Sequence, residues 1–321
     1  MKQRILYIFT RAPLHIGAGQ SVAAIDQPIV RERHTGFPSM PASGIKGVAA
    51  DQWNTLQPSA DGKPATLVRS EEGRWIVGSD DPKNPSAGAV TFSDGRLLAL
   101  PLRSAKGSFG WVTSPLILRR AVRDGVLSQG DIPTIEPEDT TVLTPEASMM
   151  RLPNGKVVLE EYCFDRCGDG KSIPDTLLTR LAALLTPESA AAAADPVWSK
   201  VSSRLVIVSD GMMSFFAQNA CEVAQHVRIE DATGTAANTG LFNQENVPSE
   251  TLFYSVLTCS DGRGAFFQKE KRTSADALEK VEAKLTACGG VLQFGGDSST
   301  GLGFCSLNLR SPATAQPATK K

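Results

Sequence analysis

Residues 4–12 read RILYIFTRA, and this stretch predicts the centre of the fold. In an extended chain Leu6 and Ile8 fall on one face, while Tyr7 and Phe9 fall on the other. Apolar side chains on both faces are typical of a strand in the middle of a sheet that is covered on both sides. The glycines that follow break the pattern, so we expect a central strand close to the amino terminus.

The rest of the chain predicts an α+β domain. The expected elements are a helix at 41–56, strands within 90–103, a helix over 108–127 that ends near Gly125, a strand at 204–210, a long loop at 233–250, a strand at 251–260, a helix at 274–290, and a strand, glycine loop and strand over 291–309. This order is typical of a palm of the ferredoxin-like type with insertions between its elements. We therefore expect one domain over 1–310, with insertions at about 57–88 and 128–200 and a frayed polar tail at 311–321.

The composition is that of a globular protein. Of the 321 residues, 41% are hydrophobic and 21% are charged, which excludes a largely disordered chain. No apolar run approaches the ~20 residues of a membrane span, and the first residues do not form a signal peptide, so we expect a cytoplasmic protein without a membrane partner. The six cysteines are scattered, which favours reduced structural thiols over a disulfide framework or a zinc site.

The charge is close to balanced overall but uneven along the chain. The formal net charge is −1, yet residues 1–50 hold six Lys and Arg against two acids. Residues 101–123 hold five basic residues and no acid. A locally positive face on a neutral protein can bind phosphate groups, although ordinary solvated faces explain the same counts.

Residues 294–304 read FGGDSSTGLGF, a glycine-rich loop between two expected strands. A dinucleotide-binding fingerprint needs a helix after the glycines and an acid about 20 residues further on, and neither is present. The loop therefore indicates a close approach of backbone to a ligand or to another strand.

Three polar residues near the amino terminus are candidates for chemistry, each with a plain structural alternative. Asp26 lies in a loop and either caps a turn or acts as a general base or cation ligand. His15 is either a satisfied structural histidine or a proton donor facing phosphate. Lys46 lies in the first turn of an expected helix capped by Ser43, where a cation is unfavourable for the helix but suited to an anion.

Four stretches together resemble the RAMP superfamily of CRISPR effector proteins, and more narrowly the repeated backbone subunit of the Cmr-type (type III-B) RNA-targeting complex. They read LHIGAG…IDQPIVRERHTGFPSMPASGIKG, PLRSAKGSFGWVTSPLIL, RIEDATGTAANTGLF and LQFGGDSSTGLGF. The resemblance runs from about residue 5 to 308, and the terminal glycine loop is the signature shared across the superfamily.

The resemblance implies a modified RRM-like palm whose copies stack along a CRISPR RNA. It also implies a β-hairpin thumb at about 233–250 that inserts between bases at six-nucleotide intervals, with Leu241 and Phe242 as the wedge. In such a family an aspartate in the loop after the first strand directs metal-dependent cleavage of the target strand, and Asp26 matches it. Asp26 is thus the implied catalytic residue and the ligand of a divalent metal, Mg²⁺ or Mn²⁺.

The resemblance also implies accessory and RNA-binding residues. Accessory catalytic roles fall to His15, Glu230 and Asp231. RNA contacts fall to His15, Arg31, Arg33, Lys46, Arg103, Lys106, Leu241, Phe242, Gly295, Gly296, Gly301 and Gly303. The implied partners are CRISPR RNA, single-stranded target RNA, further copies of the chain and other Cmr-type subunits.

Two other functions remain open from the sequence. One is a backbone subunit that holds RNA without cutting it, which substitution of Asp26 would distinguish. The other is a metal-independent RAMP nuclease that processes precursor guide RNA, with histidine in acid–base chemistry. A nucleotide-cofactor enzyme is a distant alternative, because the glycine loop lacks the required context.

Overall fold

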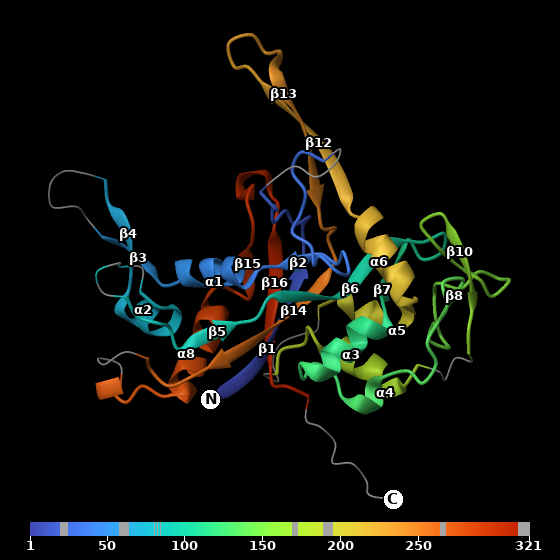
Figure 1. The fold of residues 1–321 in the computed structure, drawn as a ribbon, viewed down its shortest axis with the longest axis horizontal. Helices are drawn as coiled ribbons and strands as arrows, with labels where there is room; N and C mark the ends of the chain where they lie inside the picture. The colour runs from blue at the N-terminus through green and yellow to red at the C-terminus, as the bar shows by residue number, and fades with distance from the viewer. Residues whose placement is uncertain are drawn as a thin grey trace, which may run out of the picture.

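A sheet built around β1 (Lys2–Thr10) organises the structure (Figure 1). The computed structural model describes residues 1–19, 25–57, 64–79, 81, 83, 85–168, 173–188, 195–263 and 268–313. Within these ranges, β1 lies between β14 (Leu252–Cys259) and β16 (Phe304–Arg310) and runs antiparallel to both. The predicted central strand is confirmed.

The sheet extends well beyond these three strands. From edge to edge its order is β11 (Leu205–Ile207), β7 (Phe109–Thr113), β6 (Gly95–Arg103), β14, β1, β16 and β15 (Val291–Gln293), with β2 (Ser39–Met40) beside β6 and β5 (Val90–Phe92) beside β14. Its neighbours are antiparallel except for β11 and β7. The chain is therefore a mixed α and β fold with one large sheet.

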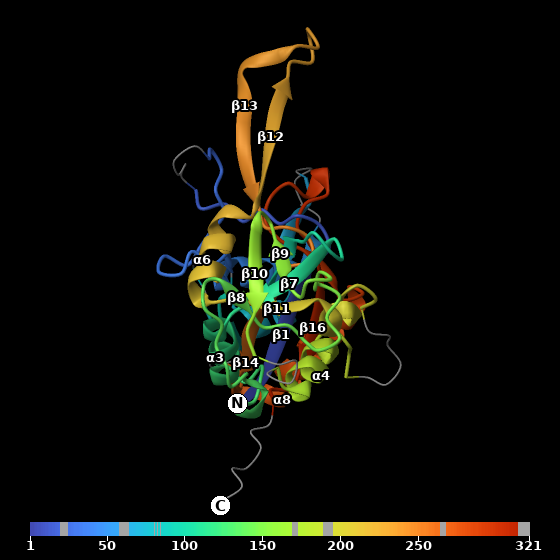
Figure 2. The same cartoon turned by 90° about the vertical axis from the view of Figure 1, so that its right-hand side faces the viewer.

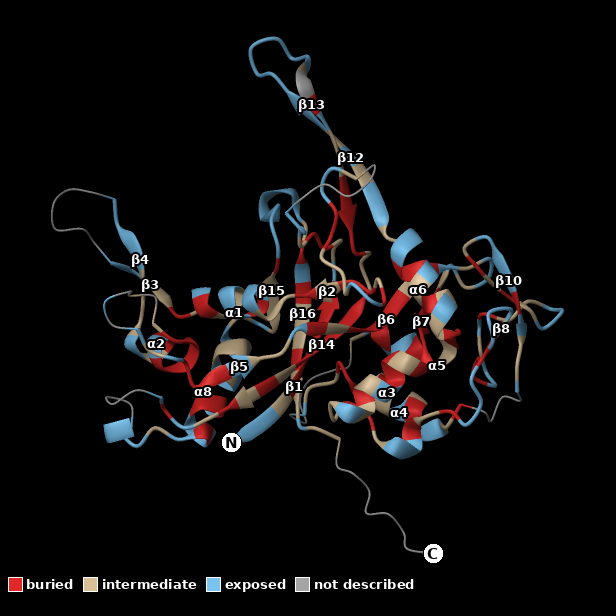
Figure 3. Ribbon diagram, in the orientation of Figure 1, coloured by how far each residue is buried: buried red, intermediate tan, exposed pale blue. Residues whose placement is uncertain are grey.

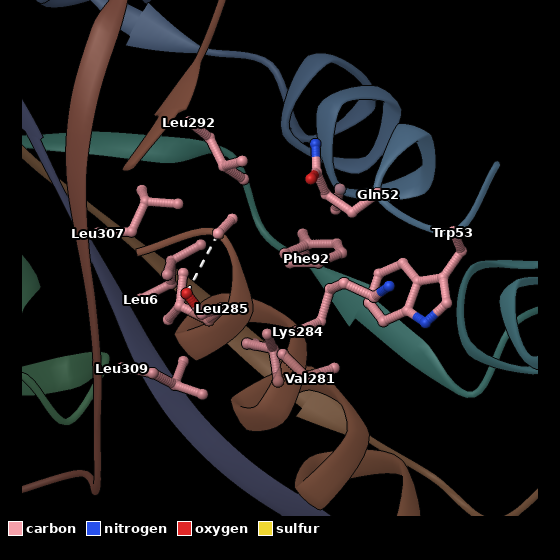
Figure 4. A pocket seen from close by; sticks show the side chains of 13 residues that line it. Leu6, Gln52, Trp53, Phe92, Val281, Lys284, Leu285, Leu292, Leu307 and Leu309 are labelled. Carbon is pink, nitrogen blue, oxygen red and sulfur yellow. Dashed lines mark hydrogen bonds between the residues drawn. The ribbon is translucent and has the colours of Figure 1, made fainter. Parts of the chain in front are cut away.

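One face of the sheet is covered by α1 (Ala42–Asp51) and α8 (Ser274–Ala287). Leu6, Leu307 and Leu309 point from the sheet toward these two helices and line a small apolar cavity of about 50 Å³ between them (Figure 4). The cavity wall is almost wholly carbon. These two helices, one following β1 and one preceding β16, form the layer beneath the central strands.

The opposite face is covered by α4 (Asp175–Ala183) and by an aromatic cluster. Phe9 packs edge-on against Trp198, and Trp198 packs edge-on against Trp111, with ring centroids 5.6 and 5.0 Å apart. Edge-to-face pairing adds to the large apolar area that these side chains bury. The cluster joins β1, β7 and the segment that leads into α5 (Val201–Arg204).

The remaining elements lie at the edges of the sheet. They are β3 (Asn54–Gln57), β4 (Thr66–Arg69), α2 (Glu71–Val77), α3 (Pro115–Arg123), β8 (Thr141–Val142), β9 (Val157–Leu159), β10 (Tyr162–Arg166) and α6 (Asp210–Asn219), with short 3₁₀ turns at Gln129–Asp131, Trp198–Lys200 and Ser298–Thr300. Among the described residues, none of the helices is long and apolar enough to span a bilayer.

The insertion at 57–88 holds a helix, α2, as well as short strands, and the Ser70 side chain caps the helix by accepting the Gly73 N–H. Two expectations for local structure are corrected. Residues 109–113 form β7, and α3 begins only at Pro115, whose fixed φ suits the first helical position. Ser43 does not cap α1; the Asp94 carboxylate accepts the Ala42 N–H at 2.8 Å instead.

A long hairpin of β12 (Glu222–Ile229) and β13 (Ala236–Asn246) stands out from the body, as Figure 2 shows. It begins earlier than the expected start at 233, since EVAQHVRI continues as a strand directly after α6. Leu241 and Phe242 lie partway along β13 rather than at the tip. Most of its outer length is exposed, while its base is buried (Figure 3). Of the expected tail at 311–321, residues 314–321 lie outside the described residues.

We predict that Trp198→Ala lowers the free energy of unfolding by about 3–5 kcal/mol, because it removes a fully buried indole and both of its ring contacts. Denaturant unfolding of the isolated chain measures the loss. The neighbouring Val197→Ala is the control: its side chain is 41% exposed, so the change stays within about 0.5 kcal/mol. Equal losses for the two variants would contradict the aromatic cluster as a stabilising centre.

Candidate functional site

A short segment of the loop after β1 pairs with the base of the hairpin. Gln27 forms a parallel bridge with Gln244 of β13. Its backbone N–H donates to the Asn243 carbonyl at 3.0 Å, and its carbonyl accepts the Glu245 N–H at 2.9 Å. The loop is thereby fixed to the strand by the same backbone bonding that joins strands within a sheet.

Asp26 directly precedes this bridge, and its side chain is exposed to solvent. One carboxylate oxygen, Oδ2, accepts the backbone N–H of Asn243 at 2.8 Å. The other oxygen has no hydrogen-bond partner among the residues that the structure describes. The carboxylate is therefore oriented by one backbone donor and keeps one oxygen open to accept a hydroxyl group or a cation.

The carboxylate of Glu245 is buried behind this loop, and the residue is only 4% exposed. Its Oε2 accepts the backbone N–H of Ile29 at 3.0 Å, and its Oε1 pairs with the Arg31 guanidinium at 2.5 Å. Arg31 also donates to the carbonyls of Gly36 and Ala217. The guanidinium of Arg31, expected to bind guide phosphate, is thus engaged by contacts within the chain.

The Cys221 thiol lies beside the same ion pair. Burial raises its pKa to about 11, against the opposing effect of the neighbouring Arg31 guanidinium. The thiol therefore stays protonated at neutral pH, and Glu245 is the group that balances the charge of Arg31.

His15 is nearly buried, and its ring is turned toward the hairpin base. Nδ1 lies 2.7 Å from the carbonyl oxygen of Glu245. Because a carbonyl oxygen only accepts, Nδ1 carries the hydrogen, and in the neutral ring Nε2 remains an acceptor. Of the two roles that the sequence left open for His15, this geometry favours the structural one.

The two ends of the glycine loop pack too closely for any side chain. A Cβ on Gly295 would lie 2.0 Å from the His15 carbonyl oxygen, and one on Gly303 would lie 1.9 Å from the Phe294 carbonyl oxygen. Both glycines also have φ near +78°, in the left-handed region that disfavours other residues. Gly295 therefore packs the loop against the segment that follows β1, and Gly303 closes the loop on its own first residue.

The tip of the glycine loop is open. A Cβ on Gly296 or Gly301 would meet nothing within 4 Å, and both residues are exposed. Asp297, between them, accepts the Gln244 amide N–H at 2.8 Å. The loop thus packs on the hairpin base and also presents bare backbone that a ligand can approach.

The expected wedge residues lie close to Asp26. Leu241 is 63% exposed, and it stands opposite Val227, which is 50% exposed. Phe242 stacks on the ring of His226, with centroids 5.1 Å apart. Since Leu241 comes two residues before Asn243, it lies about 7 Å along β13 from the backbone donor that binds Asp26.

The two acids expected beside the hairpin do not join Asp26. Glu230 and Asp231 fall in the turn at the tip, where the Glu230 N–H donates to the Thr235 carbonyl. Ala236, at the tip end of β13, is about 23 Å along the strand from Asn243. That span separates both acids from the carboxylate at the base.

The basic candidates divide into two groups. Arg103 forms ion pairs with two glutamates, and Lys106 donates to a backbone carbonyl. Arg33 and Lys46 are exposed and form no ion pair with any described residue. Arg33 and Lys46 therefore keep their charges available for phosphate.

The surroundings of Asp26 fit a divalent ion only if RNA supplies some of the ligands. No group of three or more His, Cys, Asp or Glu side chains within the described ranges is arranged to hold a metal. Mg²⁺ binds through one or two carboxylates together with waters and substrate phosphates, so one carboxylate with an open oxygen suffices when RNA supplies the rest.

The sequence analysis did not identify three buried polar residues of β13. They are Gln244, Glu245 and Asn246, which are 2%, 4% and 2% exposed. Neighbouring side chains on a strand point to opposite faces, so Gln244 reaches the glycine loop while Glu245 reaches the Asp26 loop. The run NQEN shows no apolar period, and the Arg31 partner of Glu245 lies 214 positions away. The only available signal was that Glu245 is an acidic residue within the loop expected at 233–250.

Comparison with known proteins finds matches along nearly the whole chain. The model of the RAMP superfamily matches residues 8–306. A protein of Pyrococcus furiosus described as the CRISPR system Cmr endoribonuclease Cmr4 is 30% identical over 316 residues, which cover 97% of this chain and 96% of that protein.

Solved structures show the same similarity. The crystal structure of oligomeric Cmr4 from Pyrococcus furiosus superposes with a TM-score of 0.66 at 27% identity, covering 97% of this chain and 98% of that one. A chain in a cryo-EM structure of the type III-B Cmr-beta complex bound to cognate target RNA gives a TM-score of 0.63, covering 96% of this chain and 97% of that one. At 18% identity this second similarity shows the fold alone.

We predict that Gly303→Ala lowers the free energy of unfolding by about 2–4 kcal/mol, since the new methyl group meets a carbonyl oxygen in a strained backbone region. Gly296→Ala, with open space around its Cβ, is the matched control and changes stability by less than about 1 kcal/mol. Thermal unfolding of both variants checks this, and a Gly303→Ala protein as stable as the control would refute the close packing.

Proposed function

Because the chain belongs to the RAMP superfamily, we propose that it is a backbone subunit of a type III-B CRISPR ribonucleoprotein, which binds CRISPR RNA and cleaves complementary target RNA. The observation that carries this proposal is the exposed Asp26 carboxylate, fixed at the hairpin base beside the exposed Leu241. The full-length similarity to a Cmr endoribonuclease supports it.

The palm is of the ferredoxin-like type. Its four strands are β1, β6, β14 and β16, which neighbour one another in the order β6, β14, β1, β16. Helix α1 follows β1, and α8 connects β14 to the final pair of strands. This βαββαβ order, with the other strands and helices as insertions, supports assigning 1–310 to one palm domain that carries the hairpin as its thumb.

The hairpin separates bases of the target, and Asp26 acts at the separated step. An exposed Leu241 inserted between bases disrupts their stacking and lets the backbone kink. Asp26 lies close along the same strand, so the kink is presented to its open oxygen. Stacked copies repeat this arrangement and give cuts at six-nucleotide steps.

The reaction is attack of a ribose 2′-oxygen on the adjacent phosphorus: the O2′–P bond forms as the P–O5′ bond breaks, which leaves a 2′,3′-cyclic phosphate. The 2′-hydroxyl proton passes to solvent, and the departing 5′-oxygen takes a proton from solvent. Asp26 accepts a hydrogen bond from the 2′-hydroxyl and holds it in line with the breaking bond; such placement supplies much of the rate. A divalent ion, Mg²⁺ or Mn²⁺, held by Asp26 and RNA oxygens would stabilise the charge that develops on the phosphate. Arg33 and Lys46 bind phosphates.

The partners that follow are CRISPR RNA, target RNA, further copies of this chain and other Cmr-type subunits. The solved structure described as oligomeric Cmr4, at 27% identity, supports the self-association. The complex works in the cytoplasm, where its RNA partners are.

We predict that Asp26→Asn in a reconstituted complex abolishes target cleavage, with a loss of at least about 10²-fold, while guide and target RNA still bind. The amide keeps an oxygen for the Asn243 N–H but loses the negative charge. Gel analysis of labelled target RNA with Mg²⁺ measures cutting, and filter binding measures affinity.

The control is Asp231→Asn, which removes an acid at the hairpin tip and leaves cutting unchanged. Regularly spaced products from the Asp26→Asn complex at the wild-type rate would overturn the role of Asp26. The chain would then be an RNA-binding backbone subunit without cleavage activity of its own.

A further inference from the structure

We infer that the buried ion pair of Glu245 and Arg31 is a positioning device that fixes Asp26 relative to the hairpin and thereby sets which phosphate is cut. This inference rests on the proposed cleavage function of Asp26. Glu245 and Arg31 thus determine the position of the cut without contacting RNA themselves.

The first step is the number of bonds that meet at Glu245. Its carboxylate binds Ile29 and Arg31, its N–H binds Gln27, and its carbonyl binds His15. Three of these four partners, Gln27, Ile29 and Arg31, follow closely after Asp26 in the loop. Among the described residues of the hairpin, Glu245 alone bonds to this loop through both its main chain and its side chain.

The second step concerns what the loop has without Glu245. Among its described residues, the loop pairs its backbone through single bridges, at Leu14 with Val247, at Gly17 with Ile29, at Gln27 with Gln244 and at Arg31 with Pro38. Isolated bridges hold a loop less firmly than a strand ladder does. Side chains add to these bridges: Asp26 accepts the Asn243 N–H, and the carboxylate of Glu245 holds the loop on both sides of Val30, at Ile29 and at Arg31.

The third step concerns charge. Arg31 is largely enclosed, and its guanidinium reaches across to Ala217 at the end of α6 as well as to Glu245. Removing the carboxylate leaves a partly buried cation without its counter-charge, which is strongly unfavourable. The loop must then move to solvate Arg31, and Asp26 moves with it.

The consequence is a fixed separation between wedge and carboxylate. Leu241 and Glu245 both belong to β13, and Glu245 binds the loop that carries Asp26. When the hairpin adjusts to RNA, Asp26 therefore moves with the wedge, and the same phosphate is presented each time. Loss of the ion pair frees the carboxylate to reach neighbouring phosphates.

The test is Glu245→Gln in the reconstituted complex, with single-turnover cleavage at saturating target RNA. The amide oxygen still accepts the Ile29 N–H, but the ion pair is lost. We expect the rate to fall roughly tenfold to a hundredfold, as a shift of about 1 Å at a reacting group does. We also expect products cut one nucleotide to either side of the wild-type position, with target affinity unchanged.

The matched control is Asp131→Asn, which breaks a similar pair elsewhere in the fold. Asp131 is 2% exposed, binds Arg180 at 2.7 Å, and accepts the backbone N–H of Ser128 at 2.7 Å. Its loss destabilises the chain in the same manner but leaves both the cleavage rate and the cut position as in wild type. Stability alone therefore cannot produce the expected result.

Hydrogen–deuterium exchange of the complex gives a readout independent of cutting. Glu245→Gln raises exchange in 25–31, whereas Asp131→Asn does not, and Asp26→Asn leaves the Ile29 amide protected. Should Glu245→Gln fail to assemble, Arg31→Gln, which also removes the ion pair, replaces it in both measurements.

The outcomes separate the two proposals. An Asp26→Asn complex that still cuts overturns the cleavage function, whatever the exchange data show. A Glu245→Gln complex that cuts at the wild-type rate and position, while Asp26→Asn is inactive, overturns the positioning role and leaves the cleavage function intact.

Discussion

A buried carboxylate needs hydrogen-bond donors and a counter-charge. At the base of the hairpin, the groups that meet this need for Glu245 come from the loop that carries Asp26. An unpaired charge in the interior is costly, so Glu245 needs both a cation and a hydrogen-bond donor. Arg31 and the Ile29 N–H provide them, and both come from the loop that carries Asp26. The geometry of the candidate site is therefore a consequence of one buried charge.

The two faces of β13 bind two different loops. Gln244 reaches Asp297 in the glycine loop, while Glu245 reaches the Asp26 loop on the other side. The glycine loop in turn packs on the His15 backbone, in the segment that follows the central strand. Segments from both ends of the chain thus converge on one strand, and the exposed part of the hairpin projects from a rigid base.

Much of the fold was accessible from the sequence because its signals are local. The apolar alternation of residues 5–9 identified β1, and the periodicity after Ser274 identified α8. Strand β7 was missed because its five residues run directly into a helix. The hairpin was placed too late because β12 follows α6 without a break that a pattern reveals.

The candidate site was less accessible, because charge is visible in a sequence but its partner is not. Arg31 and Arg103 looked available for phosphate, yet each forms an ion pair with a glutamate that is distant in the chain. Asp26 was singled out by family resemblance, whereas its local sequence favoured a turn residue. The bonds of Gln244 and Glu245 depend on segments brought together only by folding.

The central claim is that Asp26 faces the phosphate to be cut because the hairpin base holds it there. A cryo-EM structure of the assembled complex, with guide and a target RNA carrying 2′-deoxy substitutions that block cleavage, tests this most directly. The account predicts the Asp26 carboxylate beside the kinked phosphate, with Glu245 still paired to Arg31. A kinked phosphate beside other residues, with Asp26 turned away from the RNA, would contradict it.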